Sequence, residues 1–354
     1  MRLVAIAASF ILMLLAGPAL SAQLDTQSIN TATFSAKDIR GKPRGPRASL
    51  VKAQILLDRA GYSPGEIDGR HGDNFAKALA AFQADHGLPS TGELDQASWD
   101  SLAGTTQEPA VTDYEITRQD LRGPFTKRIP VKFEAMAHLR RLGYRNVEEE
   151  LAEKFHISPE LLKAMNPRER FKKPGDTITV AAVAQPDLAR VKANRQAPLP
   201  GSATRLEIDK DRLTLKAFDA TGRLLHFFPA SVGSEDKPAP SGTLEIERVN
   251  LKPDYTYNPK YAFKGVKARH PFTIAPGPNN PVGLVWIDLN AEGDGIHGTP
   301  DPGRISKRYS HGCIRLTNWD ALTLATLVRQ GVPVTFIGNG PQPAAADPTV
   351  DKAD

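Results

Sequence analysis

The C-terminal half of the chain alternates between apolar and polar residues over many short segments. This period of two predicts half-buried β-strands. The segments are residues 205–209, 212–218, 223–232, 243–249, 284–289 and 334–337. One helical pattern follows late, between residues 318 and 331. Many short strands with one late helix predict a mainly β sandwich or barrel over residues 203–338.

The N-terminal half instead repeats apolar residues at helical spacing. Three short stripes fall within residues 48–104, and Asp95 stands where it can cap the third helix. The stripe residues are Leu50, Ala53 and Leu57, then Phe75, Leu79 and Phe82, then Trp99 and Leu102. The pattern therefore predicts a small three-helix domain.

A second small unit is predicted over residues 143–183. Its first helix carries Leu151, and its second begins after Ser158, a good capping residue. A Pro-Gly turn at residues 174–175 then leads into a strand. With this α/β module in the middle, the whole chain is predicted to be a multidomain α+β protein.

Polar segments rich in Pro, Gly or Ala separate these units. They predict linkers at residues 23–47, 105–142 and 184–202, and a disordered tail at residues 339–354. Within the second linker, residues 114–117 alternate like an edge strand and residues 131–142 are typical of a helix.

The first 22 residues have the pattern of a secretory signal peptide. A basic start at Arg2 precedes an apolar run over residues 3–15, and small residues follow at 19–22. An uncleaved N-terminal anchor is the alternative, but the run is short for a membrane span. We expect export to the periplasm or cell envelope, with no stable membrane span after leader cleavage.

Composition and charge narrow the class of partner. The chain has 354 residues, of which 40% are hydrophobic, so it can form packed cores. Its formal net charge of +5 includes Arg2 of the leader. This mild basic bias suits a polyanionic wall polymer, although a solvated surface explains it equally well. No pattern of basic and aromatic residues indicates nucleic-acid binding.

Cys313 is the only cysteine in the chain and lies in residues 310–316 (Ser-His-Gly-Cys-Ile-Arg-Leu). A lone cysteine is often a small buried apolar residue. Here His311 precedes it closely, and a second His-Gly unit begins at His297. An imidazole can take the thiol proton and leave a thiolate, which is the nucleophile. Gly312 lets backbone N–H groups approach an oxyanion. The residues therefore indicate a cysteine acyltransferase.

Two motifs then resemble the L,D-transpeptidase catalytic domain family. One pairs residues 297–299 (His-Gly-Thr) with residues 310–316, and the other is residues 276–283 (Pro-Gly-Pro-Asn-Asn-Pro-Val-Gly). The resemblance implies that the substrate is a peptidoglycan stem peptide. It also implies that Cys313 attacks the diaminopimelate–D-Ala bond, releases D-Ala and passes the acyl group from a thioester to an amine.

Either histidine can serve Cys313, because His311 shares its tight turn and His297 reaches it from another segment. The resemblance assigns the base to His297, with the Gly298 carbonyl holding its second nitrogen, and gives His311 a supporting role. The residues expected to support the site are the oxyanion glycine Gly312, the substrate-binding or loop-bracing Arg315, and Ser310 and Thr299, which shape the loops. Trp286, inside an apolar run, is predicted to be a core residue. No metal or other cofactor is expected.

The two small units resemble wall-binding modules. Residues 67–69 (Ile-Asp-Gly), Phe82, Gln83 and Trp99 resemble the type 1 peptidoglycan-binding domain, and residues 151–178 resemble a degenerate lysin-motif (LysM) module. Stem peptides and glycan strands are therefore the expected partners, and an envelope protein is a further possible acyl acceptor. Two alternatives stay open: an L,D-carboxypeptidase, in which water resolves the thioester, and a non-catalytic wall-binding protein.

Overall fold

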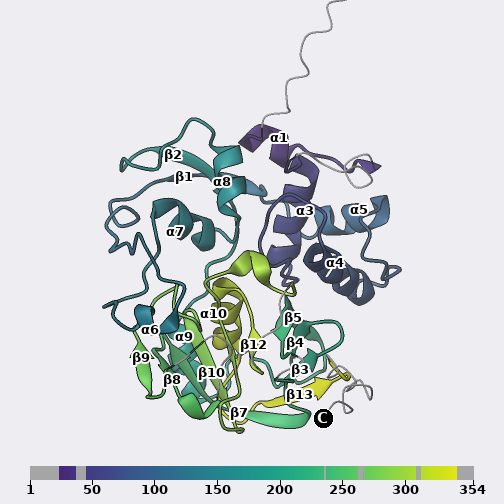
Figure 1. Cartoon of the computed structure of the whole chain (residues 1–354). Helices are drawn as coiled ribbons and strands as arrows, with labels where there is room; N and C mark the ends of the chain where they lie inside the picture. The colour runs from purple at the N-terminus through teal and green to yellow at the C-terminus, as the bar shows by residue number, and fades with distance from the viewer. Residues whose placement is uncertain are drawn as a thin grey trace, which may run out of the picture.

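The structure, a computed structural model, describes residues 24–36, 45–234, 237–261, 266, 268–307 and 312–340. The expected leader lies outside the described residues, as does most of the expected tail. Three units are packed together (Figure 1). Two smaller ones lie side by side above a large β-rich unit formed by the C-terminal half of the chain. Within the described part of the chain, no helix is long and apolar enough to cross a bilayer.

The predicted three-helix domain is confirmed. Its helices are α3 (Ala48–Arg59), α4 (Asp73–Asp85) and α5 (Gln96–Gly104). Asp95 caps α5, because its carboxylate accepts a hydrogen bond from the Ser98 backbone N–H at 2.8 Å. The apolar stripes meet in one core that includes Leu50, Leu57, Phe75, Leu79, Phe82, Trp99 and Leu102.

The predicted linker at residues 23–47 is wrong in part, since it contains the helix α1 (Thr26–Asn30). Asp25 and Ser28 form a capping box at its start. Ile29 is fully buried in a core that α1 shares with α3 and the middle unit. The capping box stabilises α1, and the buried Ile29 side chain packs this otherwise polar helix against the core.

The middle unit has the order strand, helix, helix, strand. The strand β1 (Val111–Glu115) pairs antiparallel with β2 (Thr177–Ala181). Between them in the sequence lie α7 (Val147–Lys154) and α8 (Pro159–Met165). Ser158 caps α8 by accepting a hydrogen bond from the Leu161 N–H at 3.0 Å. The first strand therefore comes from the segment that we predicted to be a linker.

The helix predicted over residues 131–142 is wrong, because only α6 (Phe133–Met136) forms there. None of the four residues in α6 is buried, and the side chain of Val131 is 92% exposed. A helix without a buried face has little packing energy to extend it. The chain beyond α6 instead contacts the large unit, where the Leu142 N–H donates to the Pro276 carbonyl at 3.1 Å.

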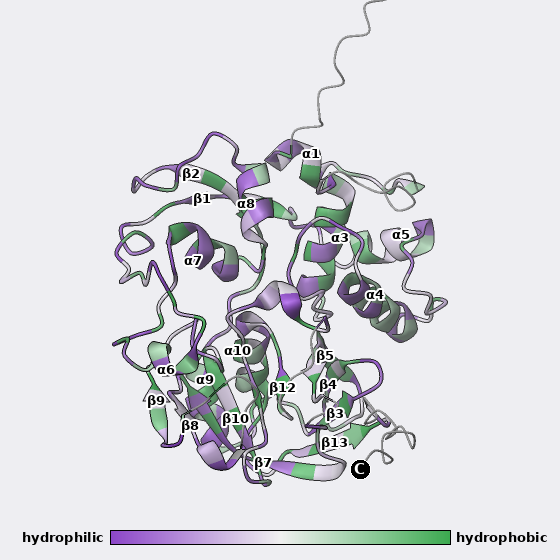
Figure 2. Cartoon of the chain, viewed as in Figure 1, coloured by the Kyte–Doolittle hydropathy of each residue, from purple (hydrophilic) through white to green (hydrophobic). Residues whose placement is uncertain are grey.

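The large unit contains a nine-stranded sheet with the order β5-β4-β3-β13-β7-β10-β11-β12-β6. These strands are β3 (Arg205–Asp209), β4 (Thr214–Phe218), β5 (Leu224–Pro229), β6 (Ser231–Val232), β7 (Gly242–Leu251), β10 (Val285–Leu289), β11 (Gly295–His297), β12 (Ile314–Arg315) and β13 (Pro333–Ile337). Hydrophobic residues run along β10 and β13, whereas many connecting loops are hydrophilic (Figure 2).

The sheet curls into a barrel-like shape, which confirms the predicted mainly β domain. Its two edge strands, β5 and β6, are separated only by Ala230, so one extended segment serves both edges. The long strand β7 also pairs with β13 through its first half and with β10 through its second. The enclosed core is made of alternate strand residues such as Leu206, Ile208, Leu215, Ile287 and Val334.

The predicted linker at residues 184–202 is also wrong, because it contains α9 (Ala189–Gln196). Its Ala, Arg and Gln content suggested a linker, but Val191 and Asn194 are buried. The Asn194 amide donates to the Val328 carbonyl at 3.2 Å, near the end of α10 (Asn318–Leu327). One apolar residue and one buried amide hold α9 against the large unit.

The remaining elements lie around the cleft described below. They are the hairpin β8 (Tyr255–Tyr257) with β9 (Phe272–Ile274) and the short 3-10 helices η1 (Pro259–Tyr261) and η2 (Pro302–Arg304).

Hydrogen bonds join the three units. The Ser63 N–H of the helical domain donates to the Phe227 carbonyl of β5 at 2.9 Å. The Ser63 hydroxyl also donates to the Asp320 carboxylate of α10 at 3.0 Å. From the middle unit, the buried Glu153 accepts a bond from the Asn318 amide at 2.9 Å. Each small unit therefore contacts the large unit directly through buried polar groups.

Candidate active site

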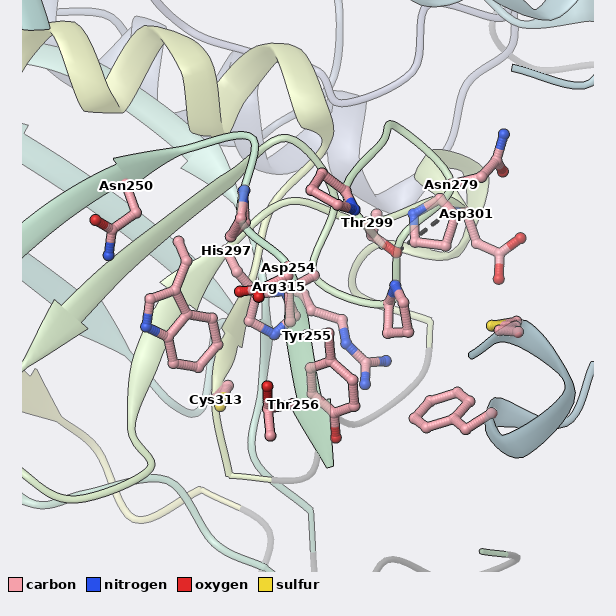
Figure 3. A pocket seen from close by; sticks show the side chains of 18 of the residues that line it. Asn250, Asp254, Tyr255, Thr256, Asn279, His297, Thr299, Asp301, Cys313 and Arg315 are labelled. Atoms are coloured by element: carbon pink, nitrogen blue, oxygen red, sulfur yellow. Dashed lines mark hydrogen bonds between the residues drawn. The ribbon is translucent and has the colours of Figure 1, made fainter. Parts of the chain in front are cut away.

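A cleft of about 1640 Å³ opens beside β10, β11 and β12, and five of the residues predicted from the sequence line it. They are His297, Thr299, Gly312, Cys313 and Arg315. Figure 3 shows the side chains of Cys313, His297 and Arg315 in this pocket, with the Arg315 guanidinium extending beside Tyr255. The His-Gly-Thr segment and the Gly-Cys-Ile-Arg segment thus meet in one cleft.

Strand pairing explains how these residues come together. The strands β11 and β12 are parallel neighbours, with Ile296 opposite Ile314 and His297 opposite Arg315. Because side chains alternate between the faces of a sheet, Ile296 and Ile314 point into the core, where both are fully buried. His297, Cys313 and Arg315 consequently share the opposite face, which forms the floor of the cleft.

The His297 imidazole is buried and held in one orientation. Its Nδ1 lies 2.7 Å from the Gly298 carbonyl oxygen, so Nδ1 is the protonated nitrogen and Nε2 is left as the acceptor. Burial, followed by the nearby positive charge of Arg315, lowers the pKa of His297 to about 3. At neutral pH the ring is therefore uncharged and ready to accept a proton.

The Cys313 thiol reaches the cleft but is closely surrounded by protein. Its Sγ lies 3.5 Å from the Gly293 carbonyl oxygen. Loss of water, and then the charge of Asp294, raises the pKa of Cys313 to about 11. The thiol therefore keeps its proton at neutral pH. Proton transfer to a base must accompany nucleophilic attack, since a resting thiolate is not favoured here.

Arg315 lies next to the thiol and offers positive charge to the cleft. Its Nε is buried, and among the described residues it has no hydrogen-bond partner. Desolvation lowers the pKa of this guanidinium. Burial and the nearby Cys313 raise the pKa of the Tyr255 phenol well above its ordinary value. A buried cation with an unused donor can receive an anionic group of a ligand.

Gly298 and Gly312 each occupy a position that disfavours a larger residue, the first by a close contact and the second by its backbone angle. A Cβ on Gly298 would lie 2.3 Å from the Asn318 side-chain oxygen. Gly312 has a φ of +102°, in the left-handed region that other residues rarely adopt. Thr299 is buried, and its hydroxyl accepts a hydrogen bond from the Asp301 N–H at 3.3 Å. These contacts fix the loops that carry His297 and Cys313.

Trp286 is not a core residue, contrary to the prediction. Its ring stacks on His297, with 5.4 Å between ring centroids, and it lines the cleft. Its Nε1 donates a hydrogen bond to the Asp288 carboxylate. The alternation of Val285, Trp286 and Ile287 already placed the indole on the face opposite the core. We missed this signal because all three residues are apolar.

Two expected site residues, Ser310 and His311, lie outside the described residues. Among the described residues, no group of three or more His, Cys, Asp or Glu side chains is arranged to hold a metal ion. The described part of the site thus offers a thiol, a neutral imidazole acceptor, a guanidinium and a glycine-containing turn. This set fits acyl transfer to a thiol with general-base assistance.

Comparison with known proteins agrees with this chemistry. Residues 203–336 match the L,D-transpeptidase catalytic domain family, and residues 46–102 match a peptidoglycan binding domain family. Both matches lie outside residues 143–183, for which the LysM-like module stays a prediction.

Several proteins named as L,D-transpeptidases are similar in sequence. One, from the ATP synthase subunits region of Fuscovulum blasticum, is 32% identical over 175 residues, which are 46% of this chain and 90% of that protein. YkuD of Bacillus licheniformis is 29% identical over 183 residues, which cover 46% of this chain and 95% of that protein.

Among solved structures, L,D-transpeptidase 1 of Mycobacterium tuberculosis aligns with a TM-score of 0.29 and 18% identity. The alignment covers 39% of this chain and 63% of that one, which is less than two thirds of its length. The similarity covers 90% and 95% of the lengths of these two relatives, and a cysteine and a histidine line one cleft of this chain. The chain therefore belongs to the L,D-transpeptidase family.

Proposed function

We propose that this chain is an exported peptidoglycan L,D-transpeptidase that uses Cys313 as its nucleophile and His297 as its general base. The observation that carries the proposal is the pairing of β11 with β12, which supports placing a buried neutral imidazole beside the thiol in one cleft. The family match and the peptidoglycan binding domain both support peptidoglycan as the substrate.

The reaction proceeds in two halves. His297 Nε2 accepts the thiol proton as Sγ attacks the carbonyl between diaminopimelate and the terminal D-Ala of a tetrapeptide stem. The carbon–nitrogen bond breaks, His297 returns the proton to the leaving D-Ala amine, and a thioester remains on Cys313. An acceptor amine then attacks the thioester, gives its proton to His297, and releases the thiol.

Other residues assist this chemistry. The backbone N–H groups of Gly312 and Cys313 stabilise the tetrahedral oxyanion, and the Gly298 carbonyl fixes the His297 tautomer. Arg315 receives a carboxylate of the stem, which agrees with its unused Nε. His311, Ser310 and Thr299 support the loops. The acceptor is an amine of a neighbouring stem or of an envelope protein; water in its place gives an L,D-carboxypeptidase.

The smaller units hold the enzyme on its polymer. The helical domain binds peptidoglycan, in line with its family match. The middle unit acts as a LysM-like module that binds N-acetylglucosamine chains. The antiparallel pairing of β1 and β2 around α7 and α8 supports this assignment. Export to the periplasm follows from the leader and from the location of the substrate.

Acylation by a carbapenem tests the nucleophile and the base. Intact-mass spectrometry should show one covalent adduct on the wild-type chain and none on Cys313→Ala. His297→Ala should acylate about 10²–10⁴-fold more slowly, the usual range for a lost general base. His71→Ala, an exposed histidine of the helical domain, is the matched control and should behave as wild type. If only His311→Ala slows acylation in a folded chain, the two histidine roles are reversed.

A further inference from the structure

One wall of the catalytic cleft is supplied by the middle unit rather than by the catalytic domain. Residues 129–136, which we call the arm, are followed in sequence by α7 and end in α6. Six residues of the arm line the same cleft as Cys313: Ile129, Pro130, Val131, Lys132, Phe133 and Met136. The arm lies between β1 and α7 in the sequence, and both of these elements belong to the middle unit. The wall is therefore formed by an insertion between two elements of that unit.

Beyond α6, the segment is fastened to the catalytic domain by backbone hydrogen bonds. The Leu142 N–H donates to the Pro276 carbonyl at 3.1 Å, and the Asn279 N–H donates to the Leu142 carbonyl at 3.0 Å. Gly277 lies between these two partners, and a Cβ there would be 2.1 Å from the Leu142 carbonyl oxygen. A glycine at this position therefore permits the close approach of the two backbones.

A second contact lies beside the thiol. The Phe133 ring meets the Tyr255 ring edge-on, with 5.6 Å between centroids and 79° between planes. Tyr255 lines the same cleft as Cys313 and Arg315, and the guanidinium of Arg315 extends beside it (Figure 3). The arm therefore contacts an aromatic residue that lines the cleft together with Cys313.

Five of the six arm residues that line the cleft are apolar. Val131 is 92% exposed although it is a large apolar residue. The cleft volume of about 1640 Å³ exceeds the usual range for a small-molecule site, about 300–1,000 Å³. Lys132 and Arg315 both line the cleft and carry positive charge. An extended, anionic peptide with aliphatic side chains matches this combination of length, apolar surface and charge.

We propose that the arm is the specificity-determining wall against which the acyl-donor stem peptide lies. This inference rests on the proposed function. While the scissile carbonyl is held at Cys313, the preceding stem residues extend over Tyr255 toward Phe133. Their methyl and methylene groups pack on Val131 and Phe133, and a stem carboxylate approaches Lys132. The donor is the occupant because it must bind before the thioester exists and must span the region next to the sulfur.

The test compares two reactions of the full-length chain carrying Val131→Asp or Phe133→Ala. The first reaction is D-Ala release from a disaccharide-tetrapeptide, and the second is alkylation of Cys313 by iodoacetamide, which is too small to need the wall. Both variants should lower kcat/KM for D-Ala release about tenfold, mainly through KM, because a lost apolar contact costs at least that factor. The alkylation rate should not change.

Leu188→Asp is the matched control, because Leu188 is an exposed apolar residue outside the cleft. It should leave both reactions unchanged. If the arm variants release D-Ala as fast as an active wild type, the assignment is overturned while the proposed function stands. The assignment is also overturned if the arm variants slow alkylation as much as they slow D-Ala release, because the arm would then affect the reactivity of the thiol and not the binding of the stem peptide. A wild type that releases no D-Ala overturns the proposed function and this assignment together.

Discussion

The indole of Trp286 stacks on the imidazole of His297, with 5.4 Å between ring centroids and 21° between ring planes. Asp288 holds the indole by accepting a hydrogen bond from its Nε1. The same carboxylate accepts bonds from the Asn250 amide at 2.9 Å and the Arg248 Nε at 3.0 Å. Gly295 leaves room for the ring, because a Cβ there would lie 2.7 Å from it. The His297 imidazole is thus held by stacking as well as by its hydrogen bond to the Gly298 carbonyl.

Releasing the indole should slow acylation without removing the base. We expect Asp288→Ala to lower kcat about 10- to 100-fold with little change in KM, because a misplaced catalytic group costs about that much. Asp288→Asn, which keeps one acceptor oxygen, should recover part of the loss. The measurement is the steady-state rate of D-Ala release. Asp219→Ala, in an exposed hairpin of the same unit, is the control. Equal rates for Asp288→Ala and wild type would remove Asp288 as a positioning residue.

The Cys313 thiol should titrate at high pH, and Asp294 should contribute to that. Burial is the main cause of its raised pKa of about 11, and the Asp294 charge is the second. In the wild type, the rate of Cys313 alkylation should increase as the pH is raised toward this pKa. Asp294→Asn removes a negative charge beside the thiolate, so its transition should move to lower pH and alkylation at pH 8 should be faster. Glu292→Gln changes an exposed acid on the same loop and is the control; its alkylation rate should depend on pH as in the wild type. If Asp294→Asn also leaves this pH dependence unchanged, the charge of Asp294 does not contribute to the raised pKa of Cys313.

Glu153 should make the interface between the middle unit and the catalytic domain sensitive to pH. Burial raises its pKa from 4.5 to about 8. The folded state therefore holds a proton that the unfolded state releases above about pH 4.5, and stability should fall as pH rises through about 8. Glu153→Gln keeps an acceptor for Asn318 and cannot ionise, so its Tm relative to wild type should rise between pH 5 and pH 9. The exposed Glu93→Gln is the control. A constant difference in Tm across this range would show that folding does not raise the pKa of Glu153, and would contradict this account.

Deleting the helical domain should destabilise the rest of the chain. The sequence suggested modules on linkers, so that residues 48–104 would be removable with no effect on small substrates. The domain instead covers Phe227, which is 2% exposed, and its Ser63 bonds the buried Asp320. The truncated chain should therefore unfold at a lower temperature than the full chain, by differential scanning calorimetry. An unchanged Tm would restore the picture of independent modules, and a sacculus pull-down would then report wall binding alone.

The local pattern of apolar and polar residues was sufficient to predict those strands whose side chains alternate regularly between the core and the solvent. The alternation at residues 205–209 and 212–218 predicted β3 and β4, and the two His-Gly units identified His297 and Cys313. Long-range packing decided what was missed. Nothing near Val131 in the sequence indicates that this segment lines the same cleft as Cys313, which comes much later in the chain. The polar composition around Val191 likewise concealed α9, whose place depends on a single buried valine and on Asn194.

The most direct measurement is the mass of the products formed from disaccharide-tetrapeptides by the wild-type chain and by Cys313→Ala. The wild type should release D-Ala and yield a dimer cross-linked through the diaminopimelate carbonyl, or a tripeptide where water is the acceptor. Cys313→Ala should return the substrate unchanged. Unchanged tetrapeptide from a folded wild type, or the same products from Cys313→Ala, would contradict a Cys313-dependent L,D-transpeptidase.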